Sequence, residues 1–395
     1  MKIVYVHQHF TLPAESGGGR GWEFARRFAL DGHEVTIVRG GVGPRKRVVD
    51  GVTVITINVR YENSMSFGRR LLSFTQFVIG SFRWVVSSRP NVVLASSTPL
   101  TVAIPAILAT LPKRTKFVFE VRDLWPEVPI RLGVLESPVL IFFAKCLERL
   151  TYRRADAVVA LSPYMANGVR EVNSNVKVIT IPNGCDLQLF DSEIRPAAYF
   201  RSIANVKDNE RLVVYAGGFG YLYDLGWCVD LAARLQEDGI RFTLIGEGMS
   251  FDSLVAQAKS TGVYRDGMFL GRLPRKEVVG FLKAADVNIS TLLDEPVLEG
   301  CSLNKVFDSM AAARPLVFNH RGWQAEEIEA EDAGWFLSRN LDRAVAVMRA
   351  ALASKDEMDS RGRNSRRVAA ESYDRDDQYR NYRDLLSTLA PVSTR

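Results

Sequence analysis

Cysteine and histidine are scarce in this sequence, with four residues of each among 395. The cysteines are scattered, without a Cys-x-x-Cys pair or a histidine beside them, which argues against a disulfide framework and against a zinc site. We therefore expect no bound metal and a reduced, cytoplasmic setting, where structural disulfides are rare. The cysteines are Cys146, Cys185, Cys228 and Cys301.

Long apolar runs are also missing. No uninterrupted stretch reaches the roughly 20 residues that span a bilayer, so no transmembrane helix is expected. Residues 1–7 lead directly into a strand pattern, without a charged segment followed by an apolar one, so we expect no signal peptide. Low-complexity tracts and internal repeats are absent. These features predict a cytoplasmic protein, either free or peripheral on the inner face of the cell membrane.

Charge is unevenly distributed along the chain. Residues 1–188 contain 24 Lys and Arg against 14 Asp and Glu, whereas the remainder contains 27 against 31. The first half is therefore basic, which predicts an anionic partner for that half alone. The sequence has no helix-turn-helix, zinc-finger or RNP-like pattern, so nucleic acid is not expected. An anionic membrane surface is the favoured partner.

The composition, 47% hydrophobic and 24% charged, is typical of a folded protein, and the length favours two domains. Apolar strands alternate with helices in both halves, which predicts two Rossmann-like α/β domains with parallel sheets and ligands at the strands' carboxyl ends. Strands are expected at 2–10, 34–38, 52–59, 91–95, 116–121, 157–161, 177–181, 212–216, 241–245, 268–270, 287–290 and 315–319. Helices are expected at 22–30, within 66–87, and at 101–109, 138–154, 225–237, 251–259, 276–284, 304–313 and 374–389.

One polar loop and the short amphipathic helix after it carry the functional prediction. Ser302 is expected to cap this helix. The first-turn amides of Leu303, Asn304 and Lys305, with the lysine charge, then form a phosphate site. Asp308 follows one turn later, at a distance that suits a ribose diol. Alternatively, Asn304 caps the helix and Lys305 forms a surface ion pair with Asp308.

The stretch from Asn304 to Val317 resembles the NKLFEYMAAGKPVV signature of retaining glycosyltransferases with the GT-B fold, in family four and its bacterial surface-polysaccharide branch. The resemblance implies that the carboxylate of Asp308 holds the ribose hydroxyls of a nucleotide sugar, and that the amides before it hold the diphosphate. Two positions depart from the family pattern. The usual Glu is Asp308, and the partner Glu eight residues earlier is Gly300, with Glu299 beside it as the candidate replacement.

Two further segments resemble the family. Residues 122–127, RDLWPE, follow a buried strand and are similar to the loop that marks the polysaccharide branch, where many relatives have a His at the position of Arg122. Without that His, the resemblance implies that Arg122 or Asp123 orients the acceptor or the transferred sugar. Alternatively, these two residues form an ion pair that fixes the loop. Residues 182–190 resemble the PNGVD..F segment that begins the crossing between domains.

Loops with glycine follow several strands and allow the backbone to approach a ligand. The resemblance implies that they surround the donor's base and diphosphate. The family's usual Arg and Lys after the first strand of the second half are replaced by Tyr-Leu-Tyr-Asp, so Lys305 and Arg272 would carry the phosphate charge. Alternatively, Arg272 is a solvated surface residue. The candidate donor-binding residues in these loops are Gly18, Gly19, Gly217, Gly220, Glu247 and Arg272.

Residues 69–84 combine arginines with interleaved aromatic side chains on an expected helix. Such a helix either lies on an anionic bilayer or covers the sheet as part of the core. The family's acceptors are often lipid-linked, which makes a membrane contact attractive. Near the C-terminus, Asp374 and Asp376 imitate a metal-binding pair, but their place at a helix start indicates capping.

The sequence thus predicts an N-terminal Rossmann-like acceptor domain (1–188), a C-terminal nucleotide-sugar domain (189–372), and a helix that crosses back to the first domain (373–395). The resemblance implies a metal-independent GT-B glycosyltransferase whose domains face each other across a cleft. It would move a sugar, with retention, from a nucleoside-diphosphate sugar, UDP favoured, to a lipid-linked or saccharide acceptor in O-antigen, capsule or exopolysaccharide biosynthesis.

The resemblance further implies that helix amides, Lys305 and Arg272 stabilise the leaving diphosphate in place of a metal, and that no cofactor takes part. Two alternatives stand beside this hypothesis. One is a GT-B nucleotide-sugar epimerase, for which His7 is the candidate acid/base group. The other is a non-catalytic, membrane-associated scaffold.

Overall fold

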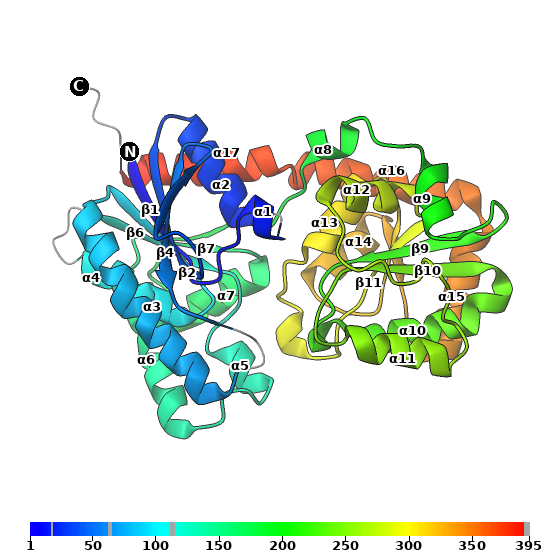
Figure 1. Cartoon of the computed structure of the whole chain (residues 1–395), viewed down its shortest axis with the longest axis horizontal. Coiled ribbons are helices and arrows are strands. Elements are labelled where there is room, and N and C mark those ends of the chain that lie inside the picture. The colour runs from blue at the N-terminus through cyan, green and yellow to red at the C-terminus, as the bar shows by residue number, and fades with distance from the viewer. Residues whose placement is uncertain (17–18, 62–64, 111–114, 391–395) are drawn as a thin grey trace. The chain divides into compact units, whose positions relative to one another are not determined.

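The computed structural model describes residues 1–16, 19–61, 65–110 and 115–390 of the chain (Figure 1). It divides the chain into two compact units, each built on its own sheet. The first unit comprises Met1–Pro182, Gly300–Ser302 and the chain from Gln378 onward, and the second comprises Asn183–Glu299 and Leu303–Asp377.

The first unit has a sheet that is parallel throughout the described residues except at one edge, where β3 pairs antiparallel with β4. Strand β3 was not predicted; its alternate residues are exposed, and it turns back at Asp50 and Gly51, both with positive φ. The predicted strand 2–10 ends early, at Val6. In order across the sheet the strands are β3 (Lys46–Val49), β4 (Val52–Asn58), β2 (Glu34–Gly41), β1 (Lys2–Val6), β5 (Val92–Ser96), β6 (Lys116–Val121), β7 (Ala157–Ala160) and β8 (Val178–Thr180).

Helices cover both faces of this sheet, because successive residues of its strands are buried on opposite sides. Val4 and Val6 of β1 pack in one core with helices α3, α4 and α6, whereas Ile3 and Tyr5 pack in another with α2 and the C-terminal helix α17 (Figure 1). The helices of this unit are α1 (Pro13–Ser16), α2 (Gly19–Leu30), α3 (Phe67–Ser88), η1 (Leu100–Val102), α4 (Ala103–Ala109), α5 (Glu127–Arg131), α6 (Pro138–Arg154), α7 (Pro163–Val172) and most of α17 (Arg375–Leu389).

The C-terminal helix α17 begins in the second unit and continues into the first. Tyr379 and Tyr382 pack against Phe24 and Phe28 of α2, and the Tyr379 hydroxyl donates a 2.6 Å hydrogen bond to Asp31. At its start, the Asp374 carboxylate accepts a 3.0 Å hydrogen bond from the backbone N–H of Asp376, as a capping residue does. The structure divides the chain after residues 182 and 377, whereas the predicted boundaries lie after 188 and 372.

The second unit has a sheet whose described strands are all parallel. The expected strand 268–270 forms only an isolated bridge between Leu244 and Phe269. The strand order is β10 (Ile240–Ile245), β9 (Arg211–Ala216), β11 (Val287–Ser290), β12 (Leu316–Phe318) and β13 (Gly334–Phe336). The helices are α8 (Leu187–Asp191), α9 (Ala197–Ile203), η2 (Tyr221–Tyr223), α10 (Leu225–Leu235), η3 (Gln236–Asp238), α11 (Phe251–Ser260), α12 (Arg275–Ala284), η4 (Pro296–Leu298), α13 (Asn304–Ala311), α14 (Trp323–Ala330), α15 (Leu341–Ala353) and α16 (Lys355–Ser372).

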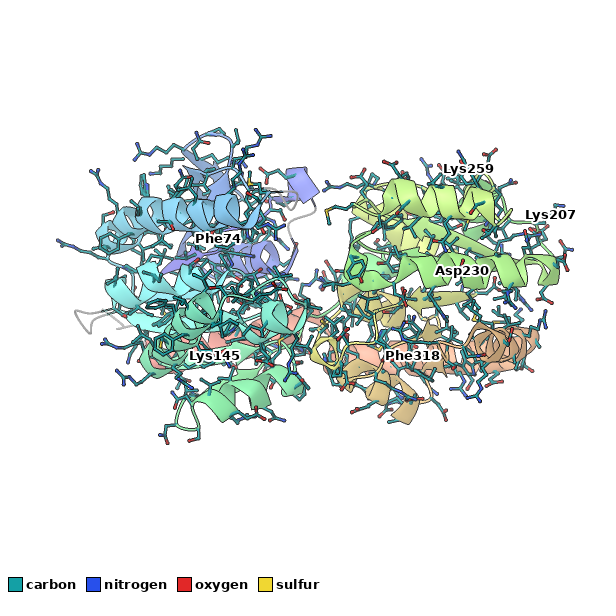
Figure 2. All side chains as sticks on the ribbon, turned by 90° about the horizontal axis from the view of Figure 1, so that it is seen from below. Phe74, Lys145, Lys207, Asp230, Lys259 and Phe318 are labelled. Carbon is teal, nitrogen blue, oxygen red and sulfur yellow. The ribbon has the colours of Figure 1, made fainter. Side chains whose placement is uncertain are left out.

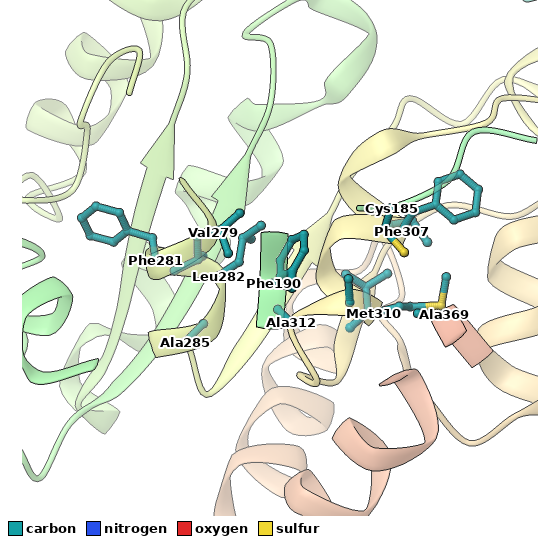
Figure 3. Close-up of a cluster of buried hydrophobic side chains, with 14 of the residues drawn as sticks. Cys185, Phe190, Val279, Phe281, Leu282, Ala285, Phe307, Met310, Ala312 and Ala369 are labelled. Carbon is teal, nitrogen blue, oxygen red and sulfur yellow. The ribbon is translucent and has the colours of Figure 1, made fainter. Parts of the chain in front are cut away.

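One core of the second unit fixes the position of α13. Phe307 and Met310 of this helix are buried beside Cys185 and Ala369, while Phe190 of α8 points toward α12 (Figure 3). The apolar residues of α13 recur at three- and four-residue steps, so one side of the helix enters this core and its first turn stays at the strand ends. Among the described residues, no helix is both long enough and apolar enough to cross a membrane.

Candidate functional site

Helix α13 begins differently from the prediction. Its N-cap residue is Leu303, whose side chain cannot cap, so the expectation that Ser302 caps the helix is wrong. The Leu303 amide donates a 2.8 Å hydrogen bond to Oε1 of the buried Gln324 on α14. This amide is thus engaged within the protein, and any phosphate site at this helix relies on the groups that follow it.

Lys305 lies in a cradle of two tyrosines. Its side chain is 8% exposed, and its Nζ donates a 2.8 Å hydrogen bond to the hydroxyl of Tyr215 at the end of β9. The same Nζ lies 3.8 Å from the ring centroid of Tyr223, close enough for a cation–π interaction. Burial raises the pKa of Tyr215, whose hydroxyl donates to the carbonyl of Gly218 at 2.8 Å. The lysine is therefore buried, not a member of a surface pair.

Asp308 faces a different neighbour. Its carboxylate makes a two-pronged ion pair with Arg275, the first residue of α12, with one contact of 2.7 Å between Nη1 and Oδ2. Burial acts to lower the pKa of Arg275, but the Asp308 charge raises it overall. Burial and the same carboxylate raise the pKa of the nearby Cys185 thiol to about 12. Arg275 was not predicted as a site residue; it directly precedes the helix predicted at 276–284, and the structure makes it the first residue of α12.

The loops that follow β9 and β10 are held together by backbone hydrogen bonds. Phe219 donates to the carbonyl of Glu247 at 2.8 Å, and Gly246 donates to Gly271 at 2.8 Å. Gly246 has φ +148°, and a Cβ there would lie 1.8 Å from the carbonyl oxygen of Gly217. Glycine is required at this position because two loops pack backbone to backbone. This contact within the protein explains the glycine at position 246, directly before the predicted donor-binding residue Glu247.

The candidate donor residues differ in exposure. A Cβ at Gly217 would lie 3.2 Å from Cε of Lys305, so this glycine leaves room for the lysine. Asn304, Glu247 and Arg272 are exposed, as expected for groups that meet a ligand from solvent. The remaining candidates lie as follows: Gly220 is half-buried beside Tyr223, Gly19 begins α2 in the first unit with φ +60°, and Gly18 lies outside the described residues.

A polar network at the ends of β11 and β12 was not predicted. The hydroxyl of Ser290 and Nε2 of His320 lie 3.0 Å apart, and the Asn319 side chain accepts a 3.0 Å hydrogen bond from the amide of Leu292. Burial lowers the pKa of His320 to about 4, so its imidazole is neutral near pH 7. The available sequence signal was the polar pair that directly follows the apolar β12 strand.

Asp224 extends this network through two neighbours. Its carboxylate accepts a 3.3 Å hydrogen bond from Asn319 and a 2.6 Å ion-pair contact from Arg339. Burial raises the pKa of Asp224 although Arg339 opposes the shift. Asp224 belongs to the Tyr-Leu-Tyr-Asp segment that replaces the family's basic residues, and within this unit it serves to orient side chains at the strand ends.

In the first unit, Arg122 and Asp123 follow β6 as predicted. The Arg122 amide donates a 3.0 Å hydrogen bond to the hydroxyl of Ser97, and Nη1 of Arg122 lies 3.2 Å from Nε2 of His7. Burial and the Arg122 charge hold the pKa of His7 well below its usual range, so Nε2 of the neutral ring accepts from Arg122. Burial raises the pKa of Asp123 to about 6, although Arg122 opposes the shift. Among the described residues, no ion pair joins Arg122 to Asp123.

The buried Glu120, near the end of β6, holds the start of this loop in place through hydrogen bonds. Its Oε1 accepts hydrogen bonds from the hydroxyls of Tyr5 (3.0 Å) and Ser96 (2.8 Å), and its Oε2 accepts from Nε of Arg20 at 3.0 Å. Burial opposes ionisation of Glu120, but Arg20 and Arg122 hold its pKa below the usual range. This ionised cluster joins β1, β5, β6 and α2, so it fixes the strand end from which Arg122 and Asp123 emerge.

The missing glutamate at position 300 has a steric explanation. A Cβ on Gly300 would lie 2.4 Å from Cδ1 of Tyr164, and the Gly300 carbonyl accepts a 2.7 Å hydrogen bond from the hydroxyl of Ser162. A glutamate cannot be accommodated there without displacing the tyrosine ring. Glu299 is half-buried in the second unit, with its backbone against Gly322.

Metal ligands do not gather in the part of the chain that the structure describes, where no three His, Cys, Asp or Glu side chains are placed to hold an ion. Metal independence of a reaction at this site stays a prediction.

Comparison with known proteins agrees with this architecture. A relative in Pseudomonas aeruginosa, named "Probable glycosyltransferase WbjE", is 29% identical over 266 residues, which are 65% of this chain and 65% of that protein, just under two thirds of its length. The structure of WaaG, "a glycosyltransferase involved in lipopolysaccharide biosynthesis", matches with a TM-score of 0.73 at 15% identity and covers 98% of this chain and 100% of WaaG. Anabaena HepE in complex with UDP-glucose matches with a TM-score of 0.70 at 17% identity, over 98% of this chain and 100% of that chain.

Two sequence families match successive parts of the chain. The glycosyl transferase 4-like domain matches residues 17–184, in the first unit and its boundary, and the glycosyl transferases group 1 family matches residues 199–368, in the second unit. Together these matches span most of the chain. The two parallel-sheet domains are those of the GT-B fold, and the chain belongs to the group 1 glycosyl transferases with a glycosyl transferase 4-like N-terminal domain.

Proposed function

We propose that this protein transfers a sugar, with retention of configuration, from a nucleoside-diphosphate sugar to a lipid-linked or saccharide acceptor in bacterial polysaccharide biosynthesis. The main observation behind this proposal is that the ammonium group of Lys305, in the first turn of α13, is buried. The tyrosine cradle holds this charge in place before any ligand binds. A preorganised, poorly solvated cation stabilises the charge that develops on a leaving diphosphate better than a solvated one does.

We favour UDP as the nucleotide, because the HepE neighbour is described as a complex with UDP-glucose. In this proposal Asp308 accepts hydrogen bonds from the ribose hydroxyls. Arg275 fixes its carboxylate from one side, and each carboxylate oxygen keeps further lone pairs for a second donor. Asn304 and Arg272, both exposed, add a hydrogen-bonding group and a charge for the diphosphate.

The proposed reaction needs neither a protein nucleophile nor a metal. The acceptor hydroxyl oxygen forms a bond to the anomeric carbon on the face from which the diphosphate departs, and a diphosphate oxygen takes the hydroxyl proton. Arg122 and Asp123 in the first unit orient the acceptor or the transferred sugar. Their shared support, the ionised Glu120 cluster and the neutral His7, keeps this loop in one geometry.

Calorimetric titration of the full-length protein with UDP, GDP and ADP tests the proposal. We expect UDP to bind, and Lys305→Met to weaken UDP binding by about 30-fold or more, because a charge-assisted contact to phosphate is lost. Asp308→Asn should weaken UDP binding while leaving the affinity for inorganic diphosphate nearly unchanged. Lys276→Met, at an exposed lysine of α12, is the matched control and should bind as the unmodified protein does.

Two outcomes would contradict the proposal. Absence of binding by all three nucleotides would leave the non-catalytic scaffold as the better hypothesis. Conversion of a UDP-sugar into its epimer, without an acceptor and without loss of UDP, would favour the epimerase.

A further inference from the structure

The second unit contains a pocket that the proposed function does not use. It lies where β10 begins, between this strand, the end of α10 and the loop that follows α11, and its volume is about 220 Å³. α10 and α11 pack against each other, and Figure 2 labels Asp230 on the first and Lys259 on the second. All the residues that line the pocket belong to the second unit.

This pocket and the proposed donor site lie at opposite ends of β10. Ile240, the first residue of the strand, lines the pocket, whereas Ile245, the last, directly precedes the loop with Gly246 and Glu247. Five residue steps along an extended strand separate its two ends by roughly 17 Å. The pocket is therefore a separate site from the one that we propose for the nucleotide.

The floor of the pocket is apolar. Its side chains are at most 4% exposed and belong to Ala232, Ile240, Phe242 and Met268. Pockets for drug-sized ligands measure about 300–1,000 Å³, so this one suits a smaller molecule and is too small for a nucleotide sugar. Water makes few hydrogen bonds against such a floor, so the apolar part of a ligand replaces it favourably.

The rim of the pocket is polar and positively charged. Arg241 forms an ion pair with Glu210, with 2.6 Å between Nη2 and Oε1. Arg265 instead donates to three backbone carbonyls, those of Phe242 at 3.0 Å, Asp266 at 3.1 Å and Ala204. Within the described chain no carboxylate forms an ion pair with Arg265. The two guanidinium groups and the one carboxylate thus leave one net positive charge.

Arg265 also keeps part of its hydrogen-bonding capacity. Burial and the Arg241 charge lower its pKa to about 10, so the side chain is still charged at neutral pH but lacks a counter-ion. Its three contacts use Nη1 and Nη2, and no described residue accepts a hydrogen bond from Nε. The edge formed by Nε and Nη2 is one of the two that match a carboxylate.

We propose that this pocket binds a small monocarboxylate with an apolar body, such as an aromatic or branched aliphatic acid. The apolar body lies on the floor, and the carboxylate pairs with Arg265 at the rim. The Gln236 amide and the Tyr264 hydroxyl, on the same rim, are further hydrogen-bonding groups. One net positive charge matches a monoanion better than a doubly charged phosphate. This binding goes beyond the proposed function and does not depend on it.

Calorimetric titration of the full-length protein with benzoate tests this inference. Benzamide offers the same ring without the charge, and acetate offers the charge without the ring. We expect benzoate to bind at one site and each of the other two to bind at least about tenfold more weakly, because each lacks one of the two contacts. Inorganic sulfate at the same concentration should not displace benzoate.

Two variants locate the binding site. Arg265→Met removes the charge and should weaken benzoate binding by about tenfold or more. Because Arg265 also bonds three carbonyls, its loss can unfold the surrounding loop, so a second variant leaves it in place. Val263→Phe enlarges a half-buried side chain that lines the pocket, and it should weaken benzoate binding to a similar extent by filling the space.

The matched control is Arg314→Met. Arg314 is likewise half-buried, with a pKa lowered by burial, and its Nη2 donates to the carbonyl of Lys283 at 2.7 Å, but it lies outside the pocket. This variant should bind benzoate as the unmodified protein does. Thermal unfolding midpoints identify the variants that keep the fold.

The inference is overturned if benzoate does not bind, if benzamide binds as tightly, or if Arg314→Met loses as much binding as Arg265→Met. It is also overturned if folded Val263→Phe keeps full benzoate binding, since the ligand then lies elsewhere. Saturating benzoate should leave UDP binding in place, and competition between the two would place benzoate in the nucleotide site instead. Benzoate binding without any nucleotide binding would contradict the proposed function alone, so the two tests fail independently.

Discussion

Lys305 and Asp308 lie almost one turn apart on α13 but serve different neighbours. The lysine turns to Tyr215 and Tyr223 at the end of β9, whereas the aspartate turns to Arg275 at the start of α12. Three helical residues rotate a side chain by less than a full turn, and that difference is enough to place the two charges in separate contacts. A phosphate and a ribose presented to this helix would thus meet two independently fixed groups.

Asp123 provides a residue-scale prediction about pH. Its pKa in the folded protein is about 6, above the ordinary value near 4, because it is buried. The folded chain then binds this proton more tightly than the unfolded chain, so its contribution to stability is present at low pH and is lost as pH rises toward 6. Asp123→Asn removes the titration. The free energy of unfolding of both proteins is measured in urea at pH 4.5 and at pH 7. The difference, variant minus unmodified protein, should be about 2 kcal/mol more positive at pH 7 than at pH 4.5.

The control for this measurement is Asp342→Asn, at an aspartate of α15 whose side chain is 79% exposed. Its stability difference should stay flat over the same range. A flat difference for Asp123→Asn as well would show that Asp123 titrates normally.

At the scale of elements, α13 ends with backbone strain. Ala313, two residues beyond the last helical residue, has φ +55°, a left-handed conformation that glycine adopts readily and alanine does not. The family signature has glycine at this position. Gly362 of α16 packs closely against this turn, since a Cβ on Gly362 would lie 2.5 Å from the carbonyl oxygen of Ala313. The turn is therefore fixed by close packing of the two backbones.

Ala313→Gly should stabilise the protein by about 1 kcal/mol, because relief of the left-handed strain exceeds the added entropy of the unfolded chain. The matched control is Ala330→Gly at the last residue of α14, an exposed alanine without positive φ, which should destabilise by about 0.5–1 kcal/mol. Chemical denaturation of both variants measures the difference. If Ala313→Gly destabilises the protein as much as the control variant does, the conclusion that Ala313 is strained is refuted.

At the scale of the whole molecule, each unit has its own sheet and cores, and the candidate groups are divided between them. The nucleotide-binding groups that we propose lie in the second unit, and Arg122 with Asp123 lies in the first. Binding of nucleotide alone should then stabilise the second unit and leave the first unit unchanged.

Hydrogen exchange with and without saturating UDP tests this division. We expect slower exchange in residues 217–224 and in the first turn of α13, and little change in α3 and α6. At 100 times the dissociation constant, UDP should add about 2.7 kcal/mol to the stability of the bound state. At the same UDP concentration, Lys305→Met, with binding about 30-fold weaker, should lower the added stability to about 0.9 kcal/mol and weaken the protection. Equal protection of the two units would contradict a nucleotide site confined to the second.

The sequence alone determined much of the architecture. Alternating apolar strands and helices predicted both parallel sheets, and the helix at 138–154 was predicted with the observed boundaries. Hydrophobic periodicity is local, so it can be read without knowing the fold. The same holds for the candidate positions of Lys305, Asp308, Arg122 and Asp123, which follow from their places at helix starts and strand ends.

The tertiary structure decided which partner each of these groups has. Lys305 meets Tyr215 across 90 residues of sequence, Asp308 meets Arg275 across 33, and Arg122 meets His7 across 115. It also decided that Gly246 serves loop packing and that α3 and α6 expose apolar sides. These properties depend on which distant segments converge and on which surfaces they leave uncovered. The local sequence pattern around a residue determines its secondary structure and the side of the helix or strand on which it lies. Its partners, burial and pKa are set by the whole packed chain.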